Sequence, residues 1–102
     1  MEAGAGAKGR EKMKQAHIFI SGSVQGVGYR FFIKSWAKTF GVVGWVKNSP
    51  EGKVEAVFQG DEKSVEDLIA KCRKGPFLAE VKDVAVNWEE GGDEFGDFRV
   101  VS

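Results

Sequence analysis

The sequence predicts an α+β protein in which two helices cover one face of an antiparallel sheet of four to five strands. One observation behind this fold class is that several short runs alternate apolar and polar residues, as strands do, whereas two longer runs repeat apolar residues at helical spacing. The other observation is the order of these runs, which is strand, helix, strand, strand, helix, strand. That order is typical of the split βαβ arrangement, the ferredoxin-like sandwich.

The first strand is predicted in the alternating run that contains Ile18 and Ile20. After a glycine-rich segment, a helix is predicted because apolar residues form a helical stripe: Phe32, Trp36 and Phe40 recur at every fourth position, with Ile33 and Ala37 beside them. Gly41 is the expected end of this helix, since glycine readily takes the left-handed conformation that closes a helix.

A hairpin is predicted next, with strands at residues 42–47 and 54–59. Pro50 and Gly52 lie between these strands and are typical turn residues. Asp61 then stands where a second helix would need an N-cap. The apolar face of that helix would carry Val65, Leu68, Ile69 and Cys72.

The last part of the chain predicts two more strands. Gly75 and Pro76 end the second helix, because proline cannot continue it. Residues 84–88 alternate as a fourth strand, and residues 98–100 suggest a short fifth one. The acidic, glycine-rich stretch at residues 89–96 is predicted to be a solvated loop.

The composition narrows the classes of function. The chain has 102 residues, which is enough for one small domain. Basic and acidic residues number 15 each, and a formal net charge of zero argues against a nucleic-acid-binding surface. We expect neither a membrane-spanning segment nor a secretion signal, because no apolar run has the required length.

Cys72 is the single cysteine and cannot form an internal disulfide, so we expect a cytoplasmic protein. One cysteine and one histidine, His17, do not supply a transition-metal site, so we expect no metal and no other cofactor. We also expect a monomer.

Residues 1–16 are rich in glycine, alanine and lysine and predict a flexible tail before a domain at residues 17–102.

The glycine-rich segment, residues 24–31, reads VQGVGYRF and lies between the first strand and the first helix. Two close glycines let the backbone bend so that successive N–H groups point at one spot, and the helix start adds its own N–H groups. Arg30 offers a fork of donors to a tetrahedral oxyanion. The segment is therefore a candidate phosphate site, although glycines in such a position often serve only a turn.

The sequence motifs of two better-known phosphate-binding loops do not match this segment. A P-loop ends in Gly-Lys-Ser or Gly-Lys-Thr, and a dinucleotide fingerprint needs a third glycine where Phe31 stands.

Asn48, at the end of the second predicted strand, is a second candidate site residue. It also has a structural interpretation, because asparagine often begins a turn by bonding its own backbone.

The segments around these candidates resemble the acylphosphatase family. The family pattern Gly-x-Val-Gln-Gly-Val-Gly-aromatic-Arg matches Gly22 through Arg30 without a departure. A second family pattern is matched around the hairpin by Gly44, Trp45, Val46, Asn48, Gly52, Val54 and Gly60. The resemblance covers roughly His17 to Ser102, favours a small free-standing acylphosphatase and implies the same ferredoxin-like fold.

The resemblance implies that the chain hydrolyses acyl phosphates to carboxylate and inorganic phosphate without a metal. Arg30 would grip the phosphoryl group, and Asn48 would orient the attacking water. The phosphate-binding residues would be Gln25, Gly26, Val27, Gly28, Tyr29 and Arg30, with backbone N–H groups from Gly26 to Arg30 sharing the load.

The same fold also hosts modules that bind single-stranded RNA. Such modules carry exposed aromatic residues on a central strand, and the third predicted strand lacks that pattern. We therefore expect a small-molecule substrate as the partner, with no nucleic acid and no membrane.

Overall fold

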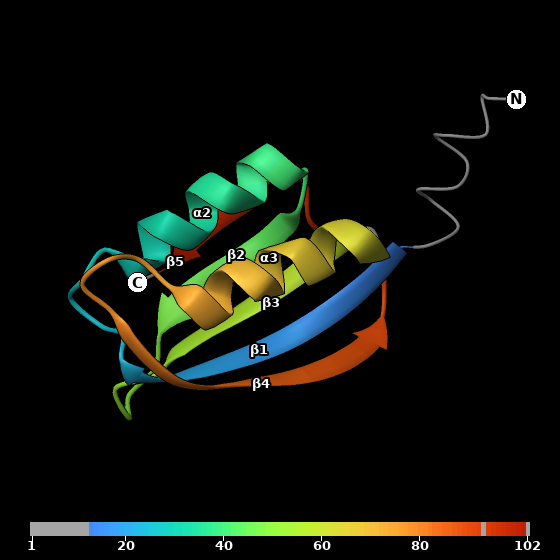
Figure 1. The fold of residues 1–102 in the computed structure, drawn as a ribbon. Helices are drawn as coiled ribbons and strands as arrows, with labels where there is room; N and C mark the ends of the chain where they lie inside the picture. The colour runs from blue at the N-terminus through green and yellow to red at the C-terminus, as the bar shows by residue number, and fades with distance from the viewer. Residues whose placement is uncertain (1–12, 93, 102) are drawn as a thin grey trace, which may run out of the picture.

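The computed structural model describes residues 13–92 and 94–101. The elements follow the predicted order: β1 (Met13–Ser23), α2 (Tyr29–Phe40), β2 (Val43–Asn48), β3 (Val54–Asp61), α3 (Glu62–Lys74), β4 (Glu80–Glu90) and β5 (Phe98–Val101). The strands form one five-stranded sheet in the order β4-β1-β3-β2-β5. Both helices lie on the same face of this sheet (Figure 1). The predicted α+β, ferredoxin-like fold is confirmed.

The direction of β5 departs from the predicted antiparallel sheet. Four strands pair antiparallel, but β5 pairs parallel to β2, with Gly44 opposite Phe98. The reason lies in the position that β5 takes in the sheet. The strands β4 and β2 run in opposite directions, and β5 reverses direction relative to β4 while joining the sheet at the far edge, beside β2. The sheet is therefore mixed.

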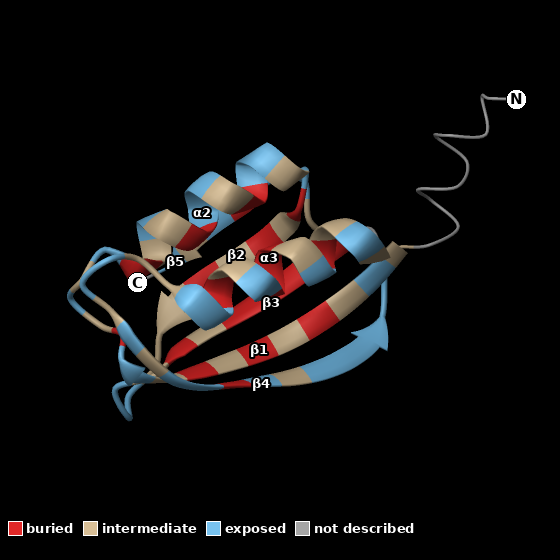
Figure 2. Cartoon of the chain, viewed as in Figure 1, coloured by how far each residue is buried: buried red, intermediate tan, exposed pale blue. Residues whose placement is uncertain are grey.

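The core lies between the sheet and the helices, as the period-two pattern of β1 predicted. Ala16, Ile18 and Ile20 have no exposed surface, whereas the residues between them are half-buried on the other face (Figure 2). In α2 the fully buried positions are Tyr29, Ile33 and Ala37, so Ile33 and Ala37 are the members of the predicted apolar stripe that enter the core.

The three aromatic members of the stripe pack along the edge of this core. Phe32, Trp36 and Phe40 are half-buried, and the rings of Trp36 and Phe40 stack with centroids 5.4 Å apart. The Lys71 ammonium of α3 lies 3.9 Å from the centre of the Trp36 ring. These residues therefore join the two helices to each other.

The predicted boundary between a tail and a domain at residue 17 is wrong for residues 13–16. They belong to β1, which begins at Met13 and pairs with Asp61 of β3 at that position. Ala16 is fully buried, so the strand begins before the residues at which its apolar–polar alternation becomes recognisable in the sequence. Residues 1–12 of the predicted tail lie outside the described residues. No helix among the described residues is long and apolar enough to cross a membrane.

The predicted loop at residues 89–96 is also shorter than expected, because Glu89 and Glu90 are the last residues of β4. They continue the ladder with β1, where Glu90 is opposite Lys14 and Glu89 opposite Gln15. Backbone pairing at the edge of the sheet therefore outweighs the acidic composition of this stretch.

Candidate active site

The two candidate segments meet at one end of the sheet. The strands β1 and β2 both run antiparallel to β3, so both end on the same side of the molecule. The glycine-rich segment follows β1 and the β2–β3 turn, residues 49–53, follows β2 (Figure 1). The Gln25 amide nitrogen lies 2.8 Å from the carbonyl oxygen of Ser49 and 2.8 Å from that of Lys53. These hydrogen bonds join the two segments directly.

Glycine is required at two positions of the glycine-rich segment. Gly26 has φ of 75° and Gly28 has φ of 78°, both in the left-handed region that other residues rarely adopt. Gly28 is the N-cap of α2, and its carbonyl accepts the first helical hydrogen bond, from the Phe32 N–H at 3.0 Å. The chain therefore passes from strand to helix in a short, tightly bent loop.

This bend leaves several backbone donors available. Among the described residues, no backbone hydrogen bond has the N–H of any residue from Gly26 to Phe31 as donor. No side chain caps α2, and its first turn contains no acidic residue. The start of a helix also carries the positive end of the helix dipole. The arrangement suits a bound anion, which would satisfy these N–H groups.

Arg30 lies in the first turn of α2, not in the loop before the helix as the sequence analysis expected. The helix starts earlier because Gly28 already serves as its N-cap. The Arg30 side chain is half-buried, and no salt bridge between described residues involves it. An arginine without a salt-bridge partner, in the same helical turn as available N–H groups, is the combination expected for gripping a phosphate.

Asn48 is the last residue of β2 and lies opposite Val54 of β3. Strand side chains alternate between faces, so Asn48 is on the same face as the fully buried Val46, beneath the helices. The following turn is closed by backbone groups, with the Ser49 N–H donating to the Lys53 carbonyl at 2.8 Å. The Asn48 side chain forms no hydrogen bond with another described residue, which gives no support to a capping role.

Three other predicted phosphate-binding residues use their side chains elsewhere. The Tyr29 hydroxyl donates to the carbonyl oxygen of Cys72, and burial raises the pKa of this phenol. Val27 packs against the core. Gln25 bonds to the β2–β3 turn. These residues can therefore contribute only their backbone groups to a ligand in this arrangement. Sequence reasoning missed the partners of the Gln25 and Tyr29 side chains, because no local pattern announces them.

The remaining titratable candidates lie away from this end or are unreactive. Burial raises the pKa of the Cys72 thiol, so the thiol stays protonated and is a poor nucleophile. His17 lies on the uncovered face of the sheet, where its Nε2 atom is 2.7 Å from a carboxylate oxygen of Glu55. Within residues 13–92 and 94–101, no three His, Cys, Asp or Glu side chains gather closely enough to hold a metal ion.

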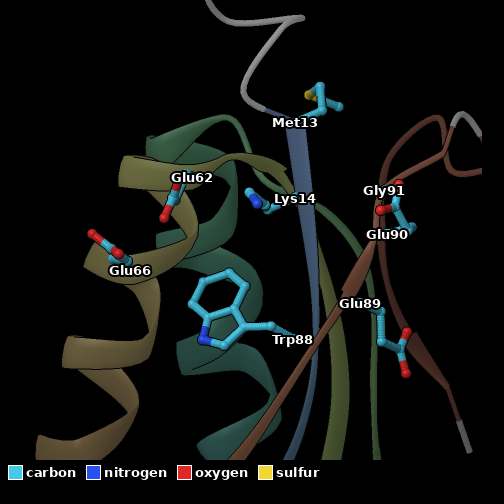
Figure 3. A pocket seen from close by; sticks show the side chains of 8 residues that line it. All are labelled: Met13, Lys14, Glu62, Glu66, Trp88, Glu89, Glu90 and Gly91. Atoms are coloured by element: carbon cyan, nitrogen blue, oxygen red, sulfur yellow. The ribbon is translucent and has the colours of Figure 1, made fainter.

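A cavity of about 430 Å³ lies at the opposite end of the molecule. Figure 3 shows the Trp88 ring in it, between α3 and the neighbouring strands, with Glu62 and Glu66 projecting from α3. None of the predicted site residues lines this cavity. Its size alone does not make it the site for an anion, because four glutamates line it and no arginine does.

Comparisons with known proteins point to one family. The model of the family described as Acylphosphatase matches residues 16–100. An acylphosphatase from Thermococcus kodakarensis is 51% identical over 79 residues, which cover 78% of this chain and 87% of that protein. An acylphosphatase from Nostoc is 47% identical over 81 residues, covering 79% and 80% respectively.

A solved structure gives the same result for the fold. The acylphosphatase from Coxiella burnetii superimposes with a TM-score of 0.85 at 33% sequence identity. The match covers 91% of this chain and 97% of that one.

Proposed function

The chain belongs to the acylphosphatase family, and from this premise we propose that it hydrolyses acyl phosphates to a carboxylate and inorganic phosphate. The observation that carries the proposal is the set of available backbone N–H groups at the start of α2, in the same turn as Arg30. Small-molecule acyl phosphates would be the partners, and inorganic phosphate the product that remains in the site before release.

In the proposed complex, Arg30 and the backbone of residues 25–30 hold the phosphoryl group. The guanidinium provides two parallel donors, and the N–H groups at the helix start provide further donors. These groups are fixed by the fold before the substrate arrives, so they stabilise the charge of the transferring phosphoryl group without rearrangement.

The Asn48 side-chain amide would position the attacking water. An amide can accept one proton of a water through its oxygen and donate to another oxygen through its nitrogen. Holding the water in line with the bond to be broken lowers the entropic part of the barrier. The water's oxygen forms the new bond to phosphorus, and the phosphorus–oxygen bond to the carboxylate breaks.

The site contains no evident general base, and we propose that a phosphate oxygen of the substrate takes the proton from water. This is sufficient for an acyl phosphate, because the leaving carboxylate is stable without being protonated. A phosphate monoester, which must expel the more basic alkoxide or phenoxide, would be a poor substrate here. We propose that the reaction needs no metal and has no covalent intermediate.

The test is phosphate release from benzoyl phosphate and acetyl phosphate, with phenyl phosphate as the monoester control, each with and without EDTA. We expect rapid release from both acyl phosphates, almost none from phenyl phosphate and no effect of EDTA. Retention on single-stranded RNA is measured in parallel and is expected to be absent. Activity that EDTA removes and a divalent ion restores would contradict the metal-free mechanism, and no release at all would contradict the function.

A further inference from the structure

The Gln25 side chain braces the β2–β3 turn by bonding to both of its arms. Its amide group has two hydrogens, and they are directed at two carbonyl oxygens, those of Ser49 and Lys53, each at 2.8 Å. Both carbonyls also accept backbone bonds within the turn: Lys53 from the Ser49 N–H at 2.8 Å, and Ser49 from the Gly52 N–H at 3.3 Å. One side chain therefore ties together both arms of the turn.

The brace lies next to Asn48, one residue closer to the turn on each of the two strands. Ser49 follows Asn48 in the chain, and Lys53 precedes Val54, the residue opposite Asn48 in the ladder. Gln25 in turn precedes Gly26, the first of the residues whose N–H groups are available at the start of α2. The distance between the phosphate-binding backbone and the Asn48 side chain is thus set through one half-buried side chain.

We propose that Gln25 is the positioning residue of the site: its side chain does not touch the substrate, but fixes the turn so that Asn48 places water against the bound phosphoryl group. This inference rests on the proposed function of Arg30 and Asn48. Both amide hydrogens of Gln25 are used on the turn, so the side chain cannot also donate to a phosphate. Its loss should affect the turnover step and leave the affinity for phosphate unchanged.

The test is a double-mutant cycle with Gln25→Met and Asn48→Ala on benzoyl phosphate. Methionine keeps the length of the side chain but removes both donors. We expect Gln25→Met to lower kcat by about 10- to 100-fold, as small misplacements of reacting groups do, with the Ki of phosphate within about twofold of wild type. In the Asn48→Ala background the same change should lower kcat by less than about twofold.

Gln15→Met is the matched control, and Tm is measured for every variant. Gln15 also bridges strands through its side chain, accepting from Gln59 and donating to Glu89, but it lies near the start of β1. We expect kcat of this variant to equal that of wild type. A purely structural role for Gln25 would lower Tm and leave kcat intact at temperatures well below Tm.

The outcomes separate the inference from the function on which it rests. If Asn48→Ala lowers kcat but Gln25→Met does not, or if Gln25→Met has an equal effect in both backgrounds, Gln25 does not act through Asn48. A large rise in the phosphate Ki for Gln25→Met would place its side chain on the substrate instead. If wild type releases no phosphate from benzoyl phosphate, or Asn48→Ala is fully active, it is the proposed function that fails.

Discussion

The two helices begin in opposite ways. At the start of α3, the Asp61 carboxylate accepts a hydrogen bond from the Lys63 N–H at 3.2 Å, and Glu62 places a second acid in the first turn. At the start of α2, the N-cap is Gly28, with no side-chain cap and no acid, and the first charged residue is Arg30. Both helix starts carry the same partial positive charge, but only α3 neutralises it with its own residues.

In the proposed function, the start of α3 serves stability and the start of α2 serves ligand binding. A capped start such as that of α3 satisfies a backbone N–H, here that of Lys63, within the protein and stabilises the folded state. In the proposed function, the uncapped start of α2 keeps its donors for a ligand and adds a cation, Arg30, in the same turn, at some cost in stability. The following predictions test whether the two starts differ in this way, in order of decreasing effect.

Arg30→Ala should nearly abolish turnover of benzoyl phosphate and weaken inhibition by inorganic phosphate. A lost charge-assisted contact to an anion costs about 1.5–3 kcal/mol, or roughly tenfold or more in Ki. Arg30→Lys should restore little, because an ammonium lacks the planar fork. Arg73→Ala, at an exposed arginine in the last turn of α3, is the matched control and should behave like wild type. Wild-type kcat/KM in Arg30→Ala would remove the functional distinction between the two helices.

Asn48→Ala should lower kcat by about 10²–10³-fold, as the loss of one preorganised polar contact does. The phosphate Ki and Tm should remain near wild type, because the turn is closed by backbone groups and Gln25. Asn87→Ala, at an exposed asparagine of β4, is the control. If Asn48 instead caps the turn, the variant would lose about 1 kcal/mol of stability and keep its activity. Measuring kcat, Ki and Tm on one preparation distinguishes the two roles.

Gly28→Asp should give α2 an acidic N-cap like that of α3 and thereby obstruct the anion. A matched Gly28→Asn variant has the same shape without the charge, and both residues tolerate the left-handed backbone better than most. No atom lies within 4 Å of a Cβ added at Gly28, so neither change causes a clash. We expect the phosphate Ki to be at least about fivefold higher for Asp than for Asn, from about 1 kcal/mol of close repulsion. Equal Ki values would mean that the anion does not bind at this helix start.

Asp61→Ala should have the smallest effect on activity. Loss of the N-cap should lower the free energy of unfolding by about 1 kcal/mol, or about 4–8 °C in Tm for a domain of this size. The kcat and the phosphate Ki should be unchanged, because Asp61 precedes α3 at the end of β3 that is remote from the β2–β3 turn. A large change in kcat without a change in Tm would show that the α3 start also serves the site.

Local patterns were sufficient to predict most elements and the residues of the candidate site. The alternation in β1 and the cap at Asp61 depend on neighbours a few positions apart, so their spacing in the sequence is informative. The bend in the glycine-rich segment was predictable for the same reason, since a tight bend between a strand and a helix needs glycines. Spacing could not give the exact start of α2, because Gly28 is as suitable for a loop as for an N-cap.

The sequence by itself determined which residues are the candidates for the chemistry: Arg30, Asn48 and the glycines around them stand out by type and order. Only the tertiary structure decided how they are held. The bonds from Gln25 to Ser49 and Lys53, the one from Tyr29 to Cys72, and the direction of β5 all join parts distant in the chain. Such contacts depend on the register and direction of whole strands, which follow from packing the complete sheet against both helices and leave no local pattern in the sequence.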